Sequence, residues 1–139
     1  MKTSQNGIDL IKRHEGLRLA AYLCPAGVPT IGYGHTKGVK LGQVITEAEA
    51  EQLLQEDLKT SEREIAGLNV NQNQFDALVS FVFNVGAGNF RSSTLLRRVR
   101  FNPDDRDIEN QFRRWVYANG RVLPGLVRRR NDESKLYFT

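Results

Sequence analysis

Hydrophobic residues recur with a helical period over most of the chain. Thr46 and Glu49 form a capping box, and the positions that follow carry one stripe at spacings of three and four: Ala50, Leu54, Leu58, Ser61 and Ile65. Residues at these spacings share one face of a helix. The pattern therefore predicts a long helix over residues 46–66.

Other segments show the same period. The first carries Ile8 and Ile11 and should end just before Gly16, since glycine commonly follows a helix. A second capping box opens a helix at Asn71, and glycines should end that helix near residues 86–88. Shorter helices are expected over three later segments: 93–100, from 104 or 105 to 117, and from just after 125 to about 137.

Residues 19–35 have a different character. They hold strand-forming residues interrupted by prolines and glycines, which predicts a small hairpin or three-stranded sheet. A small front sheet followed by a run of helices is typical of an α+β fold. We expect one domain over 1–139, with a small lobe over about 16–45, a connecting helix over about 46–66, and a helical lobe over about 67–139 that includes the N-terminal helix.

Composition narrows the class of protein. The chain has 139 residues, 40% of them hydrophobic, and a single cysteine, Cys24, so no internal disulfide can form. Its longest apolar stretch, residues 81–85, is far shorter than the roughly 20 residues that a bilayer requires, so we expect no stable membrane insertion. The first ten residues lack the apolar core of a secretory signal, and we expect the protein to accumulate in the cytoplasm.

Charge is divided unevenly along the chain. Residues 1–90 carry a net charge of −2 and residues 91–139 carry +6, within a total of +4. A basic half favours an anionic partner, such as a nucleic acid, a phospholipid surface or an acidic cell-wall polymer. No segment shows the clustered base-reading side chains of a recognition helix, so no nucleic-acid partner is expected.

Glu15 is the first candidate for catalysis. It lies four residues after Ile11, on the inward stripe and in the last turn of the first predicted helix. The negative end of the helix dipole disfavours a carboxylate there, and partial burial acts in the same direction. A carboxyl group kept protonated near neutral pH is what a general acid requires. On position alone, a surface glutamate or one half of an ion pair is the simpler alternative.

Cys24 and Thr30 are candidates in the predicted hairpin. They are symmetric about Gly27, so a hairpin that turns there would place their Cβ atoms roughly 5 Å apart on one face. A thiol and a hydroxyl at that separation could hold a water molecule. The alternative is a cross-strand pair with no catalytic role.

The two histidines have structural explanations. His35 invites a zinc site together with Cys24 and Glu15, but neither an HExxH motif nor a close histidine pair is present. We therefore expect no metal, and a structural hydrogen bond for His35 inside the turn at 32–35. His14 is expected to face solvent.

Three consecutive arginines cannot share one role, because successive residues on a helix lie about 100° apart. Arg129 falls on an inward stripe, where it could pair with Glu133 or approach Glu15. Arg128 and Arg130 are expected to be solvated and to contribute to long-range attraction.

Several short runs stand at informative spacings: HEGLRL at 14–19, TIGYGHT at 30–36, FNVG at 83–86, STLLR at 93–97 and LPGLVRRR at 123–130. Together with the isolated positions Ala21, Tyr22, Gly27, Phe90 and Trp115, they resemble the lysozyme-type phage endolysins, family 24 of the glycoside hydrolases. The resemblance spans nearly the whole chain.

This resemblance implies a lysozyme-like α+β fold. It also implies hydrolysis of the β-1,4 bond between N-acetylmuramic acid and N-acetylglucosamine in peptidoglycan. Glu15 matches the family's general acid, and Thr30 matches the threonine that positions the attacking water. Cys24 stands where most members carry an aspartate, whereas glycosidases commonly use two carboxylates.

Three interpretations of Cys24 are open. It acts as a thiolate that activates water or stabilises the transition state, which would require the basic half to lower its pKa from the usual value near 8.5. Alternatively, Thr30 positions water alone, or the enzyme is a lytic transglycosylase that needs a single acid.

We therefore expect a peptidoglycan hydrolase that degrades the host wall during lysis. We expect it to need no cofactor, to act as a monomer, and to reach the periplasm through a holin-type lesion. A lytic transglycosylase and a non-catalytic wall-binding module are the alternatives.

Overall fold

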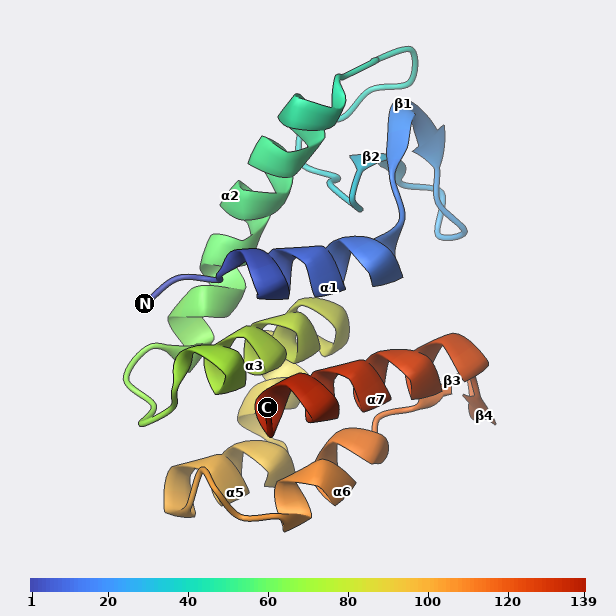
Figure 1. Ribbon diagram of the computed structural model, residues 1–139. Helices are drawn as coiled ribbons and strands as arrows, with labels where there is room; N and C mark the ends of the chain where they lie inside the picture. The colour runs from blue at the N-terminus through green and yellow to red at the C-terminus, as the bar shows by residue number, and fades with distance from the viewer.

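The computed structural model describes all residues, 1–139. Its elements follow in the order α1 (Gln5–Glu15), β1 (Arg18–Leu23), β2 (Pro29–Gly32), α2 (Glu47–Ile65), α3 (Gln72–Val85), α4 (Ala87–Arg91), α5 (Thr94–Phe101), α6 (Asp107–Arg113), β3 (Tyr117–Ala118), β4 (Arg121–Val122) and α7 (Pro124–Tyr137). The hairpin of β1 and β2 lies beside one end of α2, and the other helices gather toward its opposite end (Figure 1). The fold is α+β, as predicted.

The long helix α2 follows the sequence signals closely. The Thr46 side chain accepts a hydrogen bond from the Glu49 amide at 3.1 Å, and the Glu49 carboxylate accepts one from the Thr46 amide at the same distance. The buried residues of α2 are the five of the predicted stripe. The capping box predicted at Asn71 is also present, and it opens α3. Local capping and period therefore account for both helices.

The front hairpin is antiparallel, and its register differs from the expected one. Tyr22 pairs with Thr30, and the Cys24 amide donates to the Val28 carbonyl at 3.1 Å. The turn is thus centred on Ala26 rather than one residue later, and the expectation that Cys24 and Thr30 stand directly opposite one another is wrong. The loop itself decides this register, because a short hairpin loop sets which residues pair.

A third segment completes the small lobe. Ala20 bridges to Val44, and Ile31 bridges to His35, so the chain after β2 folds back along the hairpin. The structure thus shows a two-stranded hairpin with short bridges rather than three full strands. Ile31 is fully buried and joins the same hydrophobic cluster as the helices.

The core of the helical part is built around α3. Phe81 is fully buried, and its ring meets those of Phe90, Phe112 and Trp115 edge to face, with centroids 5.5–6.3 Å apart. Such aromatic pairs contribute beyond the area that they bury. Figure 1 shows α3 between α1 and α7, so α3 supports the helices on both sides.

Two features after α3 differ from the predictions. The chain resumes as the short helix α4 directly after Gly86, where only an end was expected. Helix α6 stops at Arg113, so Trp115 lies beyond it rather than on its stripe. The tertiary contact of Trp115 with Phe81 therefore outweighs the helical period at that point.

A second, very short hairpin went unpredicted. Strands β3 and β4 pair through Tyr117 with Val122, across a turn at Asn119 and Gly120 that both adopt positive φ. Asn-Gly favours such turns because both residues tolerate that conformation. This hairpin delivers the chain to the start of α7.

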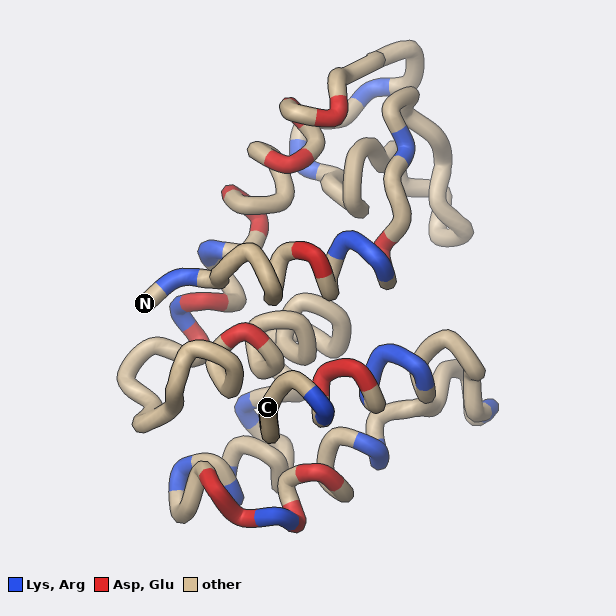
Figure 2. The backbone as a smooth tube through the Cα atoms, viewed as in Figure 1, with Lys and Arg blue, Asp and Glu red and all other residues tan.

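Charge separates between parts of the fold. Acidic residues recur along α2, whereas Lys and Arg are frequent on the later helices, including α7 (Figure 2). No helix is both long enough and apolar enough to cross a membrane.

Candidate active site

Glu15 lies at the junction between the helical part and the front hairpin. It is the last residue of α1, and Gly16 ends the helix with φ 74°, a conformation that favours glycine. The chain then enters β1 after one further residue. The Glu15 side chain is 21% exposed, so its carboxyl group is partly shielded and still reaches solvent.

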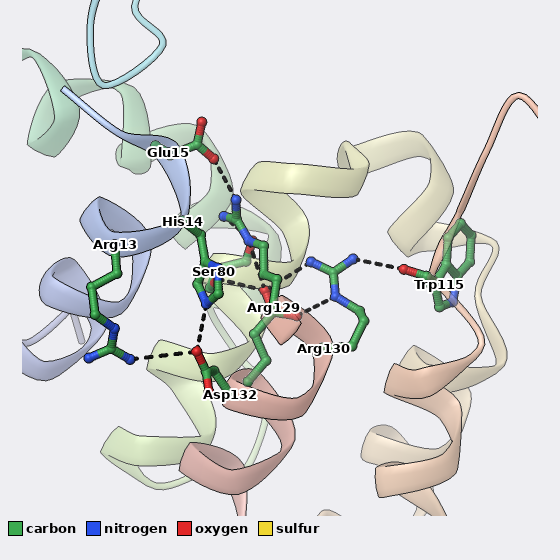
Figure 3. A network of polar contacts seen from close by, with 9 residues as sticks. Arg13, His14, Glu15, Ser80, Trp115, Arg129, Arg130 and Asp132 are labelled. Carbon is green, nitrogen blue, oxygen red and sulfur yellow. Dashed lines mark hydrogen bonds and ion pairs between the residues drawn. The ribbon is translucent and has the colours of Figure 1, made fainter. Parts of the chain in front are cut away.

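Both oxygens of the Glu15 carboxyl group have close neighbours. Oε2 accepts a hydrogen bond from Arg129 Nη1 at 2.6 Å, across 114 positions of sequence (Figure 3). Oε1 lies beside Gly34, where a Cβ atom would stand only 3.3 Å away. Gly34 has φ +89°, so any larger residue there would be both strained and crowded against the carboxyl group. The site thus joins α1, α7 and the chain after β2.

Arg129 is itself held by buried partners. It is 4% exposed, its Nε donates to Glu133 Oε2 at 3.3 Å, and its Nη2 donates to the Ser80 carbonyl at 3.2 Å. The Ser80 hydroxyl also donates to Glu133 Oε2, at 2.6 Å. The prediction that Arg129 points inward is confirmed, and it meets both Glu133 and Glu15.

Arg130 belongs to the same network, and the expectation that it is solvated is wrong. It is 0% exposed, with Nε 2.7 Å from Glu133 Oε1 and Nη1 donating to the Trp115 carbonyl at 3.3 Å. Its guanidinium also lies over the Phe81 ring, 5.0 Å from the centroid. Burial lowers the pKa of the Arg130 guanidinium, and the charge of Glu133 opposes that shift. The contacts with Glu133, the Trp115 carbonyl and the Phe81 ring offset the free-energy cost of burying a second guanidinium beside that of Arg129.

His14 also departs from expectation. Its Nε2 lies 2.7 Å from Asp132 of α7, and its side chain is largely buried rather than facing solvent. Arg13 approaches the same carboxylate at 3.8 Å. His14 therefore connects the last turn of α1 to α7. The ion pair between Glu15 and Arg129 connects the same two helices (Figure 3).

Cys24 lies in the hairpin loop and is partly exposed. Hydrogen bonds from the backbone of Val28, then of Ala26, lower the pKa of its thiol. The expectation that the distant basic half lowers this pKa is therefore wrong, because the cause is the loop's own backbone. The thiolate is favoured by local geometry.

Thr30 is the second residue of β2 and is 4% exposed. Its hydroxyl donates to the Val28 carbonyl at 2.9 Å. Because that bond uses the hydroxyl hydrogen, the Thr30 oxygen remains available only as an acceptor. Thr30 lies on β2 and Cys24 in the loop before it, and the two are not a direct cross-strand pair.

A groove opens at Glu15, with a volume of about 590 Å³. Its walls come from the end of α1, the first turns of α7 and one residue of α3: Arg13, His14, Glu15, Asn84, Leu123, Gly125, Leu126, Arg128 and Arg129. Cys24 and Thr30 are not among them. The structure therefore brings the predicted residues together as two groups, Glu15 with Arg129 in the groove and Cys24 with Thr30 in the front hairpin.

His35 has a structural role, with partners outside the turn in which they were expected. Its Nδ1 lies 2.8 Å from Asp57 of α2, and its Nε2 lies 2.9 Å from the Lys37 carbonyl. No group of three His, Cys, Asp or Glu side chains is arranged to hold a metal ion. The contact of His35 with Asp57 instead connects the small lobe to α2.

The sequence model of the phage lysozyme family matches residues 12–133. The chain belongs to this family. An endolysin of Acyrthosiphon pisum secondary endosymbiont phage 1 is 44% identical, over 99% of this chain and 98% of its own length. A crystal structure of a P22 lysozyme variant superposes with a TM-score of 0.90 and 38% identity, covering 100% of this chain and 99% of its own. The muramidase domain of SpmX from Asticaccaulis excentricus gives 0.92 and 39%, covering 99% and 98%.

Other phage lysozyme relatives are longer. The chain spans 55% of an endolysin of Bacillus phage B103, at 43% identity. It spans 73% of a SAR-endolysin of Bacteriophage PS119, at 45% identity over 86% of this chain. Membership of the family makes this phage lysozyme a glycoside hydrolase that degrades peptidoglycan.

Replacing Glu133 with glutamine should destabilise the fold. The change leaves two buried guanidiniums without their shared carboxylate, and breaking a buried ion pair costs about 3–5 kcal/mol. Urea unfolding measures the loss. Glu109→Gln is the matched control, because Glu109 pairs with Arg113 at the surface and its loss should cost no more than about 1 kcal/mol. Equal effects of the two substitutions would contradict the role given to Glu133.

The thiol of Cys24 should react with iodoacetamide at a lower pH in the folded chain than in the urea-unfolded chain. Its pKa is lowered by contacts that exist only in the folded loop, so the thiolate forms earlier as the pH rises. The midpoint of the rate against pH measures this. Thr30→Val should leave the midpoint of the folded chain close to that of the wild type, because the backbone contacts to the thiol remain. Coincident midpoints for the folded and unfolded chains would refute the assignment.

Proposed function

We propose that this phage lysozyme cleaves the β-1,4 bond between N-acetylmuramic acid and N-acetylglucosamine, with Glu15 as the general acid. The observation that carries the proposal is the fixed carboxyl group in the groove. Arg129 occupies Oε2, so a proton on the carboxyl group resides on Oε1. Its transfer to the glycosidic oxygen breaks the bond to the leaving sugar and leaves an oxocarbenium-like centre.

Thr30 and Cys24 then act on the attacking water. The Thr30 oxygen accepts one hydrogen of the water, since its own hydrogen is given to Val28. The Cys24 thiolate takes the proton that the water loses as its oxygen bonds to the anomeric carbon. The lowered pKa of the thiol supports this role, because a base must be unprotonated when the substrate binds.

We extend the proposal to the whole chain. Residues 1–139 form one catalytic domain, in which the lobe over about 16–45 carries Cys24 and Thr30 and the helical part carries Arg129. The protein acts as a monomer. It accumulates in the host cytoplasm and reaches peptidoglycan through a holin-type lesion.

Glu15→Gln should abolish wall hydrolysis without unfolding the chain. The amide has the same shape but cannot deliver a proton, and loss of a general acid costs about 100- to 10,000-fold in rate. Turbidity loss of outer-membrane-stripped cells measures the rate, and thermal melting confirms the fold. Glu56→Gln, an exposed change on α2, should keep full activity. A folded Glu15→Gln protein that retains more than a tenth of the activity would refute the assignment.

Mass spectrometry of the digested wall tests the reaction type. Hydrolysis in ¹⁸O-labelled water should give reducing ends that carry the label. A lytic transglycosylase would instead give unlabelled 1,6-anhydro ends, because the muramic acid 6-hydroxyl attacks in place of water. This second candidate is favoured by one observation, that Cys24 and Thr30 do not line the groove of Glu15. Absence of any cleavage would indicate a wall-binding module.

Substitutions at Cys24 separate its possible roles. Cys24→Ser should lose most of the activity, because a serine hydroxyl is a much weaker base. Cys24→Asp should keep or raise activity, and it should already work in mildly acidic buffer, where the thiol is protonated. The pH profile of each variant measures this difference. Normal hydrolysis by Cys24→Ser, with reducing-end products, would show that the thiol is a bystander and that Thr30 with water suffices.

A further inference from the structure

The groove at Glu15 is lined by more basic than acidic side chains. Three arginines and His14 line it, against the single carboxyl group of Glu15. Two of these arginines already have acidic partners: Arg129 pairs with Glu15 and Glu133, and Arg13 shares Asp132 with His14. The remaining one is Arg128.

Arg128 has no acidic partner and no hydrogen-bond partner in the structure. It is exposed on the first turns of α7, directly before the buried Arg129. Its Nη2 lies 3.7 Å from the point where a Cβ atom on Gly125 would stand, so the guanidinium lies alongside another residue of the groove wall. A guanidinium presents a planar fork of donors that matches a carboxylate.

We propose that Arg128 binds a free carboxylate of the peptide stem carried by the substrate. This inference rests on the proposed function. The glycan of peptidoglycan consists of neutral N-acetylated sugars, so its backbone offers no partner for an unpaired cation. The anionic groups of the polymer are carboxylates of the short peptides attached to muramic acid. A cation beside the general acid therefore selects strands that carry these peptides.

The role of Arg128 is binding rather than chemistry. It lies next to Arg129 along the helix, but it does not contact Glu15. A contact made equally in the substrate complex and the transition state changes KM and leaves kcat unaltered. A change in KM with unaltered kcat would therefore distinguish Arg128 from the residues that act on the glycosidic bond.

The test combines two substrates with four proteins. Purified peptidoglycan is used either native or with its carboxylates amidated by carbodiimide and methylamine, so that both forms keep their peptides. The proteins are the wild type, Arg128→Gln, Arg128→Lys and Arg100→Gln. Arg100 is the matched control because it is exposed and unpaired on α5, outside the groove. Assays at 0.15 M salt screen attractions beyond about 8 Å.

For the wild type, amidation should raise KM roughly tenfold with kcat unchanged, as expected for loss of one charged hydrogen-bonded contact. Arg128→Gln should show that raised KM already on native peptidoglycan and should respond little to amidation. Arg128→Lys should recover part of the affinity, and Arg100→Gln should behave as the wild type.

The inference is overturned if Arg128→Gln loses as much on amidation as the wild type does, or if its KM on native peptidoglycan equals that of the wild type. A fall in kcat with unchanged KM would also overturn it. Failure of the proposed function has a different signature, since the wild type would then cleave neither form of peptidoglycan. Thermal melting of each variant shows that the compared proteins are folded.

Discussion

The ion pair between Arg129 and Glu15 is the contact on which the geometry of the site depends. It joins the end of α1 to α7, two elements at opposite ends of the sequence, and it places a carboxyl group at the base of the front hairpin. Arg129 can hold this position only because Glu133 and the Ser80 carbonyl occupy its other donors. A buried guanidinium without such partners would carry a large desolvation penalty.

The ion pairs around Arg129 also reflect the need of each buried guanidinium for acceptors. Two guanidiniums, those of Arg129 and Arg130, face two carboxyl groups, those of Glu15 and Glu133, and backbone carbonyls take further donors. An apolar core could be as stable, since buried ion pairs often add little net stability. What the charged core provides is a carboxyl group with one oxygen fixed and the other available, which an apolar core cannot supply.

In the front hairpin, the pKa of the Cys24 thiol is set by neighbouring residues of the same loop. The backbone of Val28 and Ala26 lowers the pKa of the Cys24 thiol through hydrogen bonds within the loop. No charged side chain is required, so the loop could exchange a carboxylate for a thiol while the network at Arg129 stayed as it is. The two halves of the proposed mechanism are therefore built independently and meet only through the substrate.

The sequence by itself determined those features that depend on neighbouring residues. Capping boxes and stripes located α2 and α3, Gly16 located the end of α1, and the inward direction of Arg129 followed from its helical stripe. Only the tertiary structure decided the burial of Arg130 and the pairing of His14, whose partner Asp132 is 118 positions away. The reason is physical: a helical period gives the direction of a side chain, but whether a charge can be buried depends on partners from other elements.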